Sequence, residues 1–162
     1  MATRKPVTVY LAGPLFTQAE WQWNERLAQR LQEQSLEVIL PQRRAEPMLK
    51  GVQSFDSKAL FRVNIESIEN ADVVVAILDG ADADSGTCWE CGYAFKAGCP
   101  VIGVRTDIRA GGDDPKVAMN LMLSISCAAI ICVPYGIRDD IAWVAAEITG
   151  AIPRVLQSLH VP

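Results

Sequence analysis

The stretch Asp72–Leu78, DVVVAIL, decides the fold of this chain. Six of its seven residues are apolar, and no polar residue interrupts them. A continuous apolar run of this length is typical of a strand buried on both faces, which occurs mainly in parallel sheets. The polar loop Asp79–Gly86 follows the run, and a short helix is predicted next at Thr87–Ala97. The stretch therefore predicts a parallel sheet that helices cover on both faces.

Strand and helix candidates alternate along the rest of the chain. Apolar, β-rich runs predict four further strands, at Val7–Leu11, Glu37–Leu40, Val101–Val104 and Ala128–Val133. Apolar residues at helical spacing predict helices at Thr17–Glu33, Ser54–Asn70, Val117–Ser124 and Asp139–Leu159. The segment Arg43–Gly51 is predicted to be a loop. Because such strands and helices form right-handed βαβ units, we predict an α/β fold. It is a single doubly wound domain over residues 1–162, with a five-stranded parallel sheet, helices on both faces and flavodoxin-like strand order.

The composition narrows the classes of function. The 162 residues are 50% hydrophobic and 21% charged, which suits one globular domain with a sizeable core. The formal net charge is −4 and no basic block occurs, so binding to a nucleic-acid polymer is disfavoured. No apolar run approaches the ~20 residues that cross a bilayer, and the short polar start is unlike a signal peptide. We expect a cytoplasmic protein that does not contact a membrane.

The loop Asp79–Gly86 and the helix after it carry the most informative polar residues. Ligands of doubly wound sheets bind outside the carboxyl ends of the strands, where this loop lies. A glutamate in the first helical turn, as predicted for Glu90, feels the positive end of the helix dipole and stays ionised, as a nucleophile must. Crowding by Glu90 favours a protonated Asp84, and glycosyl chemistry needs two carboxyl groups in different states. Thr87 and Glu90 are also spaced as a capping box, in which Glu90 only satisfies a backbone N–H.

The five cysteines include a C-x-x-C pair, Cys88 and Cys91, in the same helix. Such a pair occurs in redox motifs and in zinc sites. A structural zinc site needs four ligands, but the chain has a single histidine, His160, and no second C-x-x-C. We therefore expect no metal and cysteines that are dispensable for chemistry. Cys127 and Cys132 fall in an apolar run, as buried free thiols in a reducing compartment often do.

Three further polar residues each allow two interpretations. Tyr10 ends the first strand, and strand alternation directs its hydroxyl either to the cleft or into the core. Asn64 lies beside the apolar stripe of its helix, either as a polar edge or as a group that faces the site. Asn120 follows a polar loop, either as a helix cap or as a ligand. The residues alone leave these choices open.

In their order along the chain, these residues resemble the nucleoside 2-deoxyribosyltransferase family over nearly the whole length. The similar pieces are YLAGPLF at 10–16, the spacing from Asn64 to Asp72, DSGTCWECGYA at 84–94 and NLM at 120–122. The block D-x-G-T-x-x-E-x-G-x-A is fairly specific. Its order after Y-x-A-G-P and before N-L-M is more specific still, so the resemblance implies roles for the residues left open above.

The resemblance implies three catalytic residues. Glu90 is the nucleophile that attacks C1′ of the deoxyribose, and Tyr10 orients it through a hydrogen bond. Asp84 contacts the base and helps to move a proton to the departing ring nitrogen. Asn64 stands where the family carries Asp or Asn, and an amide there holds the sugar or base instead of delivering a proton.

The resemblance also implies a set of substrate-binding residues. Asn120 binds the sugar 5′-hydroxyl, partly for the site of a neighbouring subunit. Phe16 lies near C2′ and discourages ribose, and Gln42 reaches the base. The full set of expected substrate-binding residues is Gly13, Phe16, Gln42, Asn64, Gly86, Asn120 and Met122.

The implied reaction is transfer of 2-deoxyribose between nucleobases by double displacement, through a covalent deoxyribosyl-glutamate and with retained configuration. It needs no cofactor. The expected partners are 2′-deoxynucleosides, free nucleobases and further copies of the chain, in a homo-oligomer built from dimers with shared active sites. One alternative is a deoxynucleoside 5′-monophosphate N-glycosidase with water as acceptor, which the apolar loop Ala12–Phe16 disfavours. Another is a non-catalytic nucleotide-binding module.

Overall fold

A computed structural model describes residues 5–49, 56–109, 111–114, 116, 119–137 and 139–158. The strands are β1 (Thr8–Ala12), β2 (Glu37–Ile39), β3 (Val73–Ile77), β4 (Val101–Arg105) and β5 (Ala129–Cys132). The helices are α1 (Gln18–Glu33), α2 (Pro41–Leu49), α3 (Ser57–Glu69), α4 (Ser85–Ala97), α5 (Leu121–Ser126) and α6 (Ile141–Ser158), and a short 3-10 helix, η1, lies at Tyr135–Ile137. None of the helices in this part of the chain is long and apolar enough to cross a membrane.

The strands form one five-stranded sheet in the order β2-β1-β3-β4-β5, and every neighbouring pair is parallel. This is the flavodoxin-like order, so the predicted fold class and strand order are confirmed. The predicted run Asp72–Leu78 contains β3, which lies at the centre of the sheet with all of its residues buried. The strand is continuously apolar because helices cover it on both faces.

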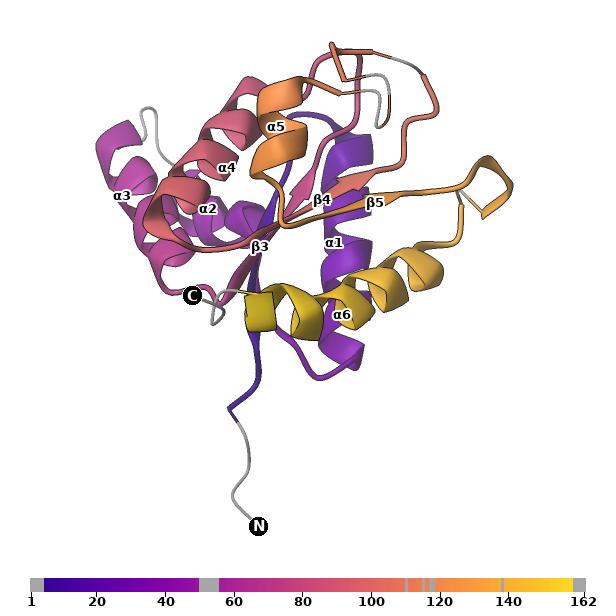
Figure 1. Cartoon of the computed structure of the whole chain (residues 1–162). Helices are drawn as coiled ribbons and strands as arrows, with labels where there is room; N and C mark the ends of the chain where they lie inside the picture. Colours follow the sequence, from indigo (N-terminus) through magenta and orange to yellow (C-terminus); the bar gives the residue numbers. More distant parts are fainter. Residues whose placement is uncertain are drawn as a thin grey trace.

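Alternation along the strands divides the interior into two cores. Val9, Leu11 and Val75 point to the face that α1 and α6 cover, where they pack with Leu27 and Ile148. Their neighbours on the same strands point to the opposite face, which α3, α4 and α5 cover (Figure 1). Tyr10 belongs to this second core, and the side on which its ring lies determines where the candidate site forms.

The segment predicted as the loop Arg43–Gly51 is helical as far as Leu49, so that prediction was wrong; residues 50 and 51 lie outside the described part. Helix α2 begins at Pro41. Proline is well tolerated at the first helical position, because the N–H that it lacks would have no partner inside the helix. The proline therefore starts the helix.

The starts of α4 and α5 also differ from the predicted ones, and the structure gives a reason for each. Helix α4 begins at Ser85 instead of Thr87, because the carboxylate of Asp84 caps it. Helix α5 was predicted at Val117–Ser124 but begins at Leu121 with Asn120 as its N-cap. Met119 lies outside the helix and is instead paired with Asp114 in an isolated antiparallel bridge.

Candidate active site

Tyr10 on β1 and Glu90 on α4 are in contact at the edge of the second core. The ring of Tyr10 is fully buried, and its hydroxyl donates a hydrogen bond of 2.6 Å to Oε1 of Glu90. The sequence alone allows either the core or the cleft for the hydroxyl of this tyrosine. The structure combines the two, since the ring packs in the core while the hydroxyl reaches the carboxylate of α4.

Burial governs the protonation of this pair. Burial raises the pKa of Glu90 to about 7, the Tyr10 hydrogen bond acts in the opposite direction, and the negative charge of Asp84 raises it further. Burial and the neighbouring Glu90 also raise the pKa of Tyr10, so the phenol keeps its proton and acts as the donor. Glu90 is the sixth residue of α4 and not part of its first turn. The expectation that Glu90 lies in the first turn, near the positive end of the helix dipole, was therefore wrong, and burial raises its pKa.

Asp84 is the residue that caps α4. Its Oδ2 accepts hydrogen bonds from the backbone N–H of Thr87 at 2.8 Å and from the Thr87 hydroxyl at 3.0 Å. The alternative in which Thr87 and Glu90 form a capping box is thereby contradicted, and Glu90 has no capping task. At Gly86 an added Cβ would lie 3.1 Å from Oδ2 of Asp84, so glycine leaves room for this carboxylate.

A pocket of about 340 Å³ opens between α3 and α4 beside Glu90. It brings Asn64 and Gly86 together with Glu90, as the sequence analysis expected of residues in one site. The Oδ1 atom of Asn64 is buried and has no hydrogen-bond partner among the residues that the structure describes. The remaining lining residues are apolar or aromatic: Phe61, Ile65, Ile68 and Trp89.

The structure places Gln42, Gly13 and Phe16 elsewhere. Gln42 is buried, its Oε1 accepts from Asn24 Nδ2 at 3.2 Å, and its Nε2 donates to the carbonyl of Trp21 at 3.1 Å. Contact with a base would require these bonds to open. An added Cβ on Gly13 would lie 3.3 Å from the Ile77 side chain, which explains a glycine there by close packing. Phe16 is 77% exposed and lines a separate shallow groove.

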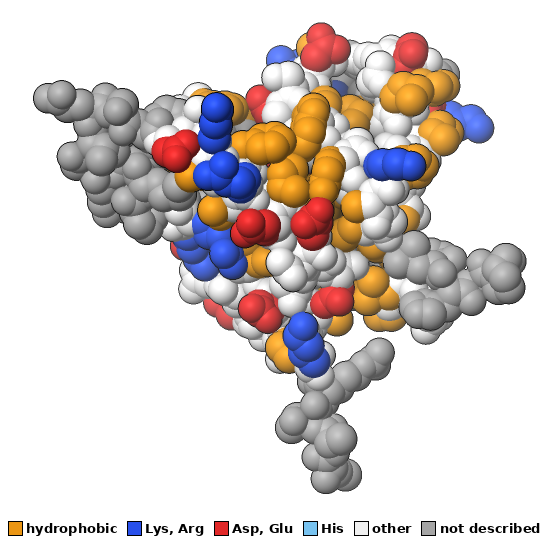
Figure 2. Space-filling model, turned by 90° about the vertical axis from the view of Figure 1, so that its left-hand side faces the viewer, with side chains coloured by type: hydrophobic (Ala, Val, Ile, Leu, Met, Phe, Trp, Pro, Cys, Tyr) orange, Lys and Arg blue, Asp and Glu red, His pale blue; other side chains and the backbone are white. Residues whose placement is uncertain are grey.

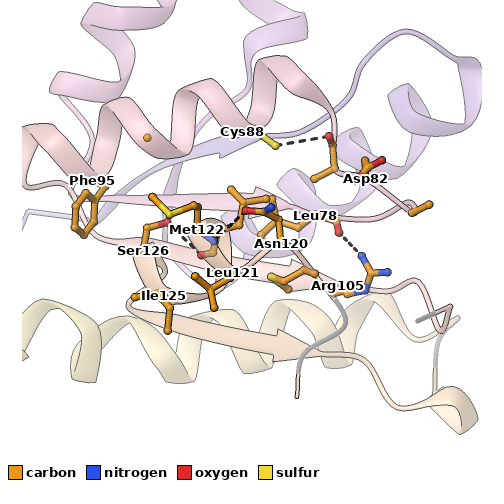
Figure 3. A pocket seen from close by; sticks show the side chains of 15 residues that line it. Leu78, Asp82, Cys88, Phe95, Arg105, Asn120, Leu121, Met122, Ile125 and Ser126 are labelled. Atoms are coloured by element: carbon orange, nitrogen blue, oxygen red, sulfur yellow. Dashed lines mark hydrogen bonds between the residues drawn. The ribbon is translucent and has the colours of Figure 1, made fainter. Parts of the chain in front are cut away.

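Asn120 and Met122 lie on another side of α4 from the Glu90 pocket. They line a larger groove of about 640 Å³ between α4 and α5, together with Cys88 and Phe95 (Figure 3). The side chain of Asn120 accepts a hydrogen bond of 2.9 Å from the backbone N–H of Met122. A single chain therefore does not bring Asn120 to its own Glu90.

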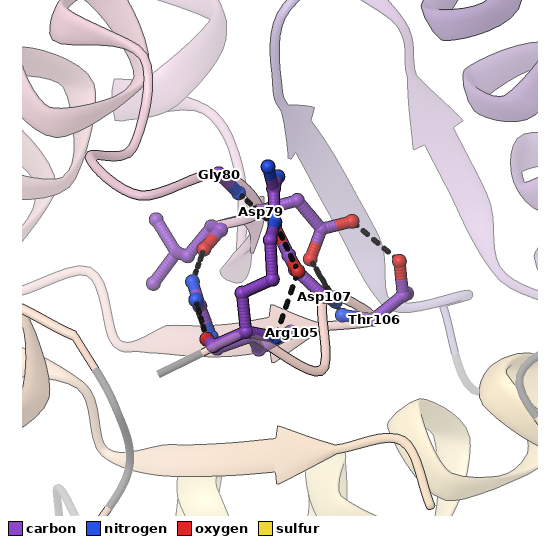
Figure 4. A network of polar contacts seen from close by, with 7 residues as sticks. Asp79, Gly80, Arg105, Thr106 and Asp107 are labelled. Carbon is purple, nitrogen blue, oxygen red and sulfur yellow. Dashed lines mark hydrogen bonds and ion pairs between the residues drawn. The ribbon is translucent and has the colours of Figure 1, made fainter. Parts of the chain in front are cut away.

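A network of hydrogen bonds accounts for Asp79, one of the loop carboxylates (Figure 4). Asp79 accepts from the backbone N–H of Thr106 at 2.5 Å, from the Thr106 hydroxyl and from the backbone N–H of Asp107 at 2.9 Å. Asp107 in turn accepts from the backbone N–H of Gly80 at 3.1 Å. These bonds tie the loops after β3 and β4 together, so Asp79 has a structural task.

The cysteines form no disulfide within the described part of the chain. Cys91 is buried, and burial raises the pKa of its thiol, so the thiol keeps its proton. No group of three or more His, Cys, Asp or Glu side chains that could hold a metal ion occurs among the described residues. Cys91 belongs to the second core, and Cys88 packs against it.

Sequence reasoning missed two features of the site. It gave no site role to Phe61 or to Trp89, although both line the Glu90 pocket. It also passed over Arg105, whose buried guanidinium donates to the carbonyls of Leu78 at 2.7 Å and Arg109 at 2.8 Å. The one available signal was the position of Trp89 directly before the candidate nucleophile.

Comparison with known proteins places this geometry in context. A family model described as nucleoside 2-deoxyribosyltransferase matches residues 9–122, which is more than half of the chain. That range includes every residue assigned to the site above. No curated protein matches the chain by sequence.

Several solved structures share the fold. A conserved protein from Enterococcus faecalis V583 is 26% identical with a TM-score of 0.67, and the match covers 86% of this chain and 99% of that one. A 2-deoxyribosyltransferase from Bacillus psychrosaccharolyticus is 24% identical with a TM-score of 0.65, and covers 84% and 90%. A CMP N-glycosidase from Clostridium botulinum is 16% identical with a TM-score of 0.56, and covers 88% and 98%.

Proposed function

The chain belongs to the nucleoside 2-deoxyribosyltransferase family, and we propose that it transfers 2-deoxyribose between nucleobases through a covalent ester on Glu90. The observation that carries this proposal is the 2.6 Å hydrogen bond from Tyr10 to Glu90 beside a pocket between two helices. A nucleophile must be held in position and must reach the substrate. Glu90 meets both conditions, and it has no capping task that would explain it otherwise.

The proposed reaction has two displacements. In the first, a carboxylate oxygen of Glu90 forms a bond to C1′ as the bond from C1′ to the base nitrogen breaks, and the base leaves with the electron pair. In the second, a ring nitrogen of the incoming base attacks C1′ and the ester bond breaks, which restores the carboxylate. Two inversions retain the configuration. No cofactor takes part in either displacement.

Asp84 is the proposed proton carrier. The departing nitrogen gains a proton and the incoming base gives one up, so a group that exchanges a single proton serves both steps. The negative charge of Asp84 contributes to the raised pKa of Glu90, so the two carboxyl groups lie within electrostatic reach of each other. Both hydrogen bonds from Thr87 go to Oδ2 of Asp84, which leaves Oδ1 for the base.

The proposed substrates are free 2′-deoxynucleosides and nucleobases. Asn64 is the amide in the Glu90 pocket and would hold sugar or base. At the start of α1, the carboxylate of Glu20 accepts from the backbone N–H groups of Phe16 at 2.9 Å and Thr17 at 2.7 Å. A phosphate at that helix start would meet occupied donors and a negative charge. This disfavours nucleoside 5′-phosphates.

The active unit is proposed to be a dimer with shared sites, within a homo-oligomer. Asn120 and Met122 are expected to bind substrate but line a groove away from Glu90 of the same chain. A second copy that presents these residues to the Glu90 pocket would resolve the separation. The free cysteines fit a reducing compartment, and we propose a cytoplasmic enzyme of nucleoside salvage.

The second candidate is an N-glycosidase, since a CMP N-glycosidase shares the fold. Water would then replace the second base as the acceptor. The Glu20 carboxylate at the start of α1 speaks against a phosphorylated substrate for this chain, but it does not bear on the choice of acceptor. The two reactions differ in whether a new nucleoside or free 2-deoxyribose appears.

Product analysis tests the proposal. The protein is incubated with deoxyinosine or thymidine, with and without adenine, and the products are separated by chromatography. Deoxyadenosine that appears only with adenine supports the transferase. Free 2-deoxyribose at the same rate with and without adenine supports the glycosidase. Binding without either product, measured by calorimetry, would leave the non-catalytic module as the explanation.

A further inference from the structure

Two half-exposed aromatic side chains stand at the pocket beside Glu90. Phe61 on α3 is 52% exposed and Trp89 on α4 is 49% exposed, and both line the pocket that contains Glu90. Figure 2 shows hydrophobic side chains gathered on the side of the molecule where α3 and α4 lie. Large apolar surface that remains exposed next to polar groups often marks a ligand site.

We propose that Phe61 and Trp89 form the aromatic surface against which the nucleobase of the substrate packs. This inference rests on the proposed function, because it assigns the base to one wall of the Glu90 pocket. The base is bonded directly to C1′, the atom that Glu90 attacks, so the base must lie next to Glu90. Trp89 is the residue before Glu90, and both line the pocket.

The two rings have the geometry of a corner. Their centroids lie 5.4 Å apart and their planes are inclined by 57°. A flat base stacked on one ring therefore presents its edge or face to the other, and both offset stacks and tilted contacts between rings are favourable. Base stacking on aromatic side chains accepts any base, because every base has a flat π-face. The corner thus fits an enzyme that exchanges one base for another.

Trp89 is held in position by a second aromatic neighbour, Tyr93. Its indole is stacked with the ring of Tyr93 at 5.5 Å and 11°, and the Tyr93 hydroxyl donates to Glu69 on α3 at 2.5 Å. An aromatic side chain that is already ordered loses little conformational freedom when a ligand binds. The Tyr93 to Glu69 contact also links α3 to α4, the two helices that carry Phe61 and Trp89.

The contact area decides which bases gain most. A purine has a larger flat surface than a pyrimidine, so it gains more from the same corner. We therefore infer that Phe61 and Trp89 strengthen the binding of purines more than that of pyrimidines. Misplacement of Glu90 would instead slow all bases alike, and this difference separates a binding surface from a structural role.

The test measures equilibrium binding of free adenine and thymine, which requires no turnover. Binding is expected to quench the fluorescence of Trp89, and calorimetry gives the Kd. Trp89→Leu and Phe61→Leu are each expected to raise the Kd of adenine roughly tenfold, and that of thymine less. Trp89→Phe keeps an aromatic ring, so it should restore most of the affinity while it removes most of the quenching. Trp143→Phe on α6 is the matched control and should leave both readouts unchanged.

The outcomes separate this inference from the proposed function. Circular dichroism checks that both leucine variants are folded. If the wild-type enzyme transfers deoxyribose but both variants bind adenine as tightly as the wild type does, the aromatic surface is overturned and the proposed function is left intact. Binding that depends on Trp89 in a protein without transfer would support the surface and reject the function. Leucine variants that become monomeric with unchanged adenine affinity would show that a second copy covers the two rings. That outcome would also overturn the inference.

Discussion

The hydroxyl of Tyr10 lies 2.6 Å from Oε1 of Glu90, although the two residues are 80 positions apart in sequence. The contact joins the central part of the sheet to α4, since β1 is the direct neighbour of β3. It fixes one carboxylate oxygen and leaves Oε2 for the substrate. The position of the proposed nucleophile thus depends on a hydrogen bond from a tyrosine whose ring lies in the protein core.

Removing that hydroxyl should impair catalysis more than folding. Tyr10→Phe keeps the buried ring and deletes the donor to Glu90. A hydrogen bond to a charged group contributes roughly 1.5–3 kcal/mol, so we expect kcat to fall about ten- to hundred-fold. Steady-state kinetics with deoxyinosine and adenine measure the effect, and circular dichroism checks the fold. An unchanged kcat would show that Glu90 needs no help from Tyr10.

The rate should depend on pH through Glu90. Burial raises the pKa of Glu90 to about 7, and only the ionised carboxylate is a nucleophile. We therefore expect kcat/KM to rise with pH through about 7 and to level above it, because the free enzyme's titration governs kcat/KM. The Tyr10 hydrogen bond lowers the pKa of Glu90. Tyr10→Phe removes this bond, so the pKa of Glu90 and the midpoint of the profile should both move to higher pH. A flat profile between pH ~5 and ~9 would contradict this assignment.

The same carboxyl group gives a control that needs no substrate. The pKa of Glu90 is raised in the folded state from 4.5 to about 7. Its contribution to stability is therefore fully present below about 4.5 and is lost as the pH rises through about 7. Glu90→Gln cannot ionise, so the variant lacks this loss. The free energy of unfolding of the variant minus that of the wild type should therefore increase as the pH rises over this range. Urea denaturation at pH ~4.5 and ~8 measures the difference.

Much of the fold can be predicted from the apolar runs. The run around β3 contains no polar interruption, and only a strand buried on both faces accounts for it. The helix starts are harder, because they depend on contacts that spacing does not reveal. Helix α5 begins later than predicted, because Met119, which the prediction placed inside the helix, pairs with Asp114 instead.

The site is predictable only in part, because it too depends on contacts that residue spacing does not reveal. Asp84 and Glu90 are close in sequence, so a local motif identifies them. The contact between Tyr10 and Glu90 exists only because β1 and β3 are neighbours in the sheet. The aromatic lining of the pocket was missed, since aromatic residues at helical spacing usually belong to a core. The position of Asn120 away from Glu90 depends on which face of α4 packs against α5.

Assembly should be required for activity. Met122 and Ile125 are both 74% exposed in the groove between α4 and α5, where a second copy is expected to dock. Met122→Glu with Ile125→Glu should give a monomer with little transferase activity, because a buried unpaired charge opposes association. Light scattering and product analysis measure the two effects. Ile108→Glu, which changes an exposed isoleucine outside the groove, is the control. A fully active monomer would refute the shared site.

The cysteines should be dispensable for chemistry. Cys91 is buried and its thiol keeps its proton, so neither redox exchange nor metal binding is expected of it. Cys88→Ser combined with Cys91→Ala should retain most of the transferase activity, at a cost in stability of about 1 kcal/mol for the lost packing. Kinetics and thermal denaturation check both statements. Loss of activity with the melting curve intact would mean that a thiol takes part in the reaction.

The covalent intermediate is the most direct prediction, because it tests the nucleophile itself. Glu90→Gln keeps the size of the side chain and an oxygen that accepts from Tyr10, so the fold should survive. An amide is a poor nucleophile, and turnover should fall by several orders of magnitude. A 2-fluoro-arabinosyl nucleoside should label the wild-type protein, since fluorine destabilises the oxocarbenium-like transition state and slows release of the ester. Trypsin should then release the labelled peptide Val63–Lys96, and fragmentation in the mass spectrometer should place the sugar on Glu90. A label on Asp84, or an active Glu90→Gln variant, would reassign the nucleophile.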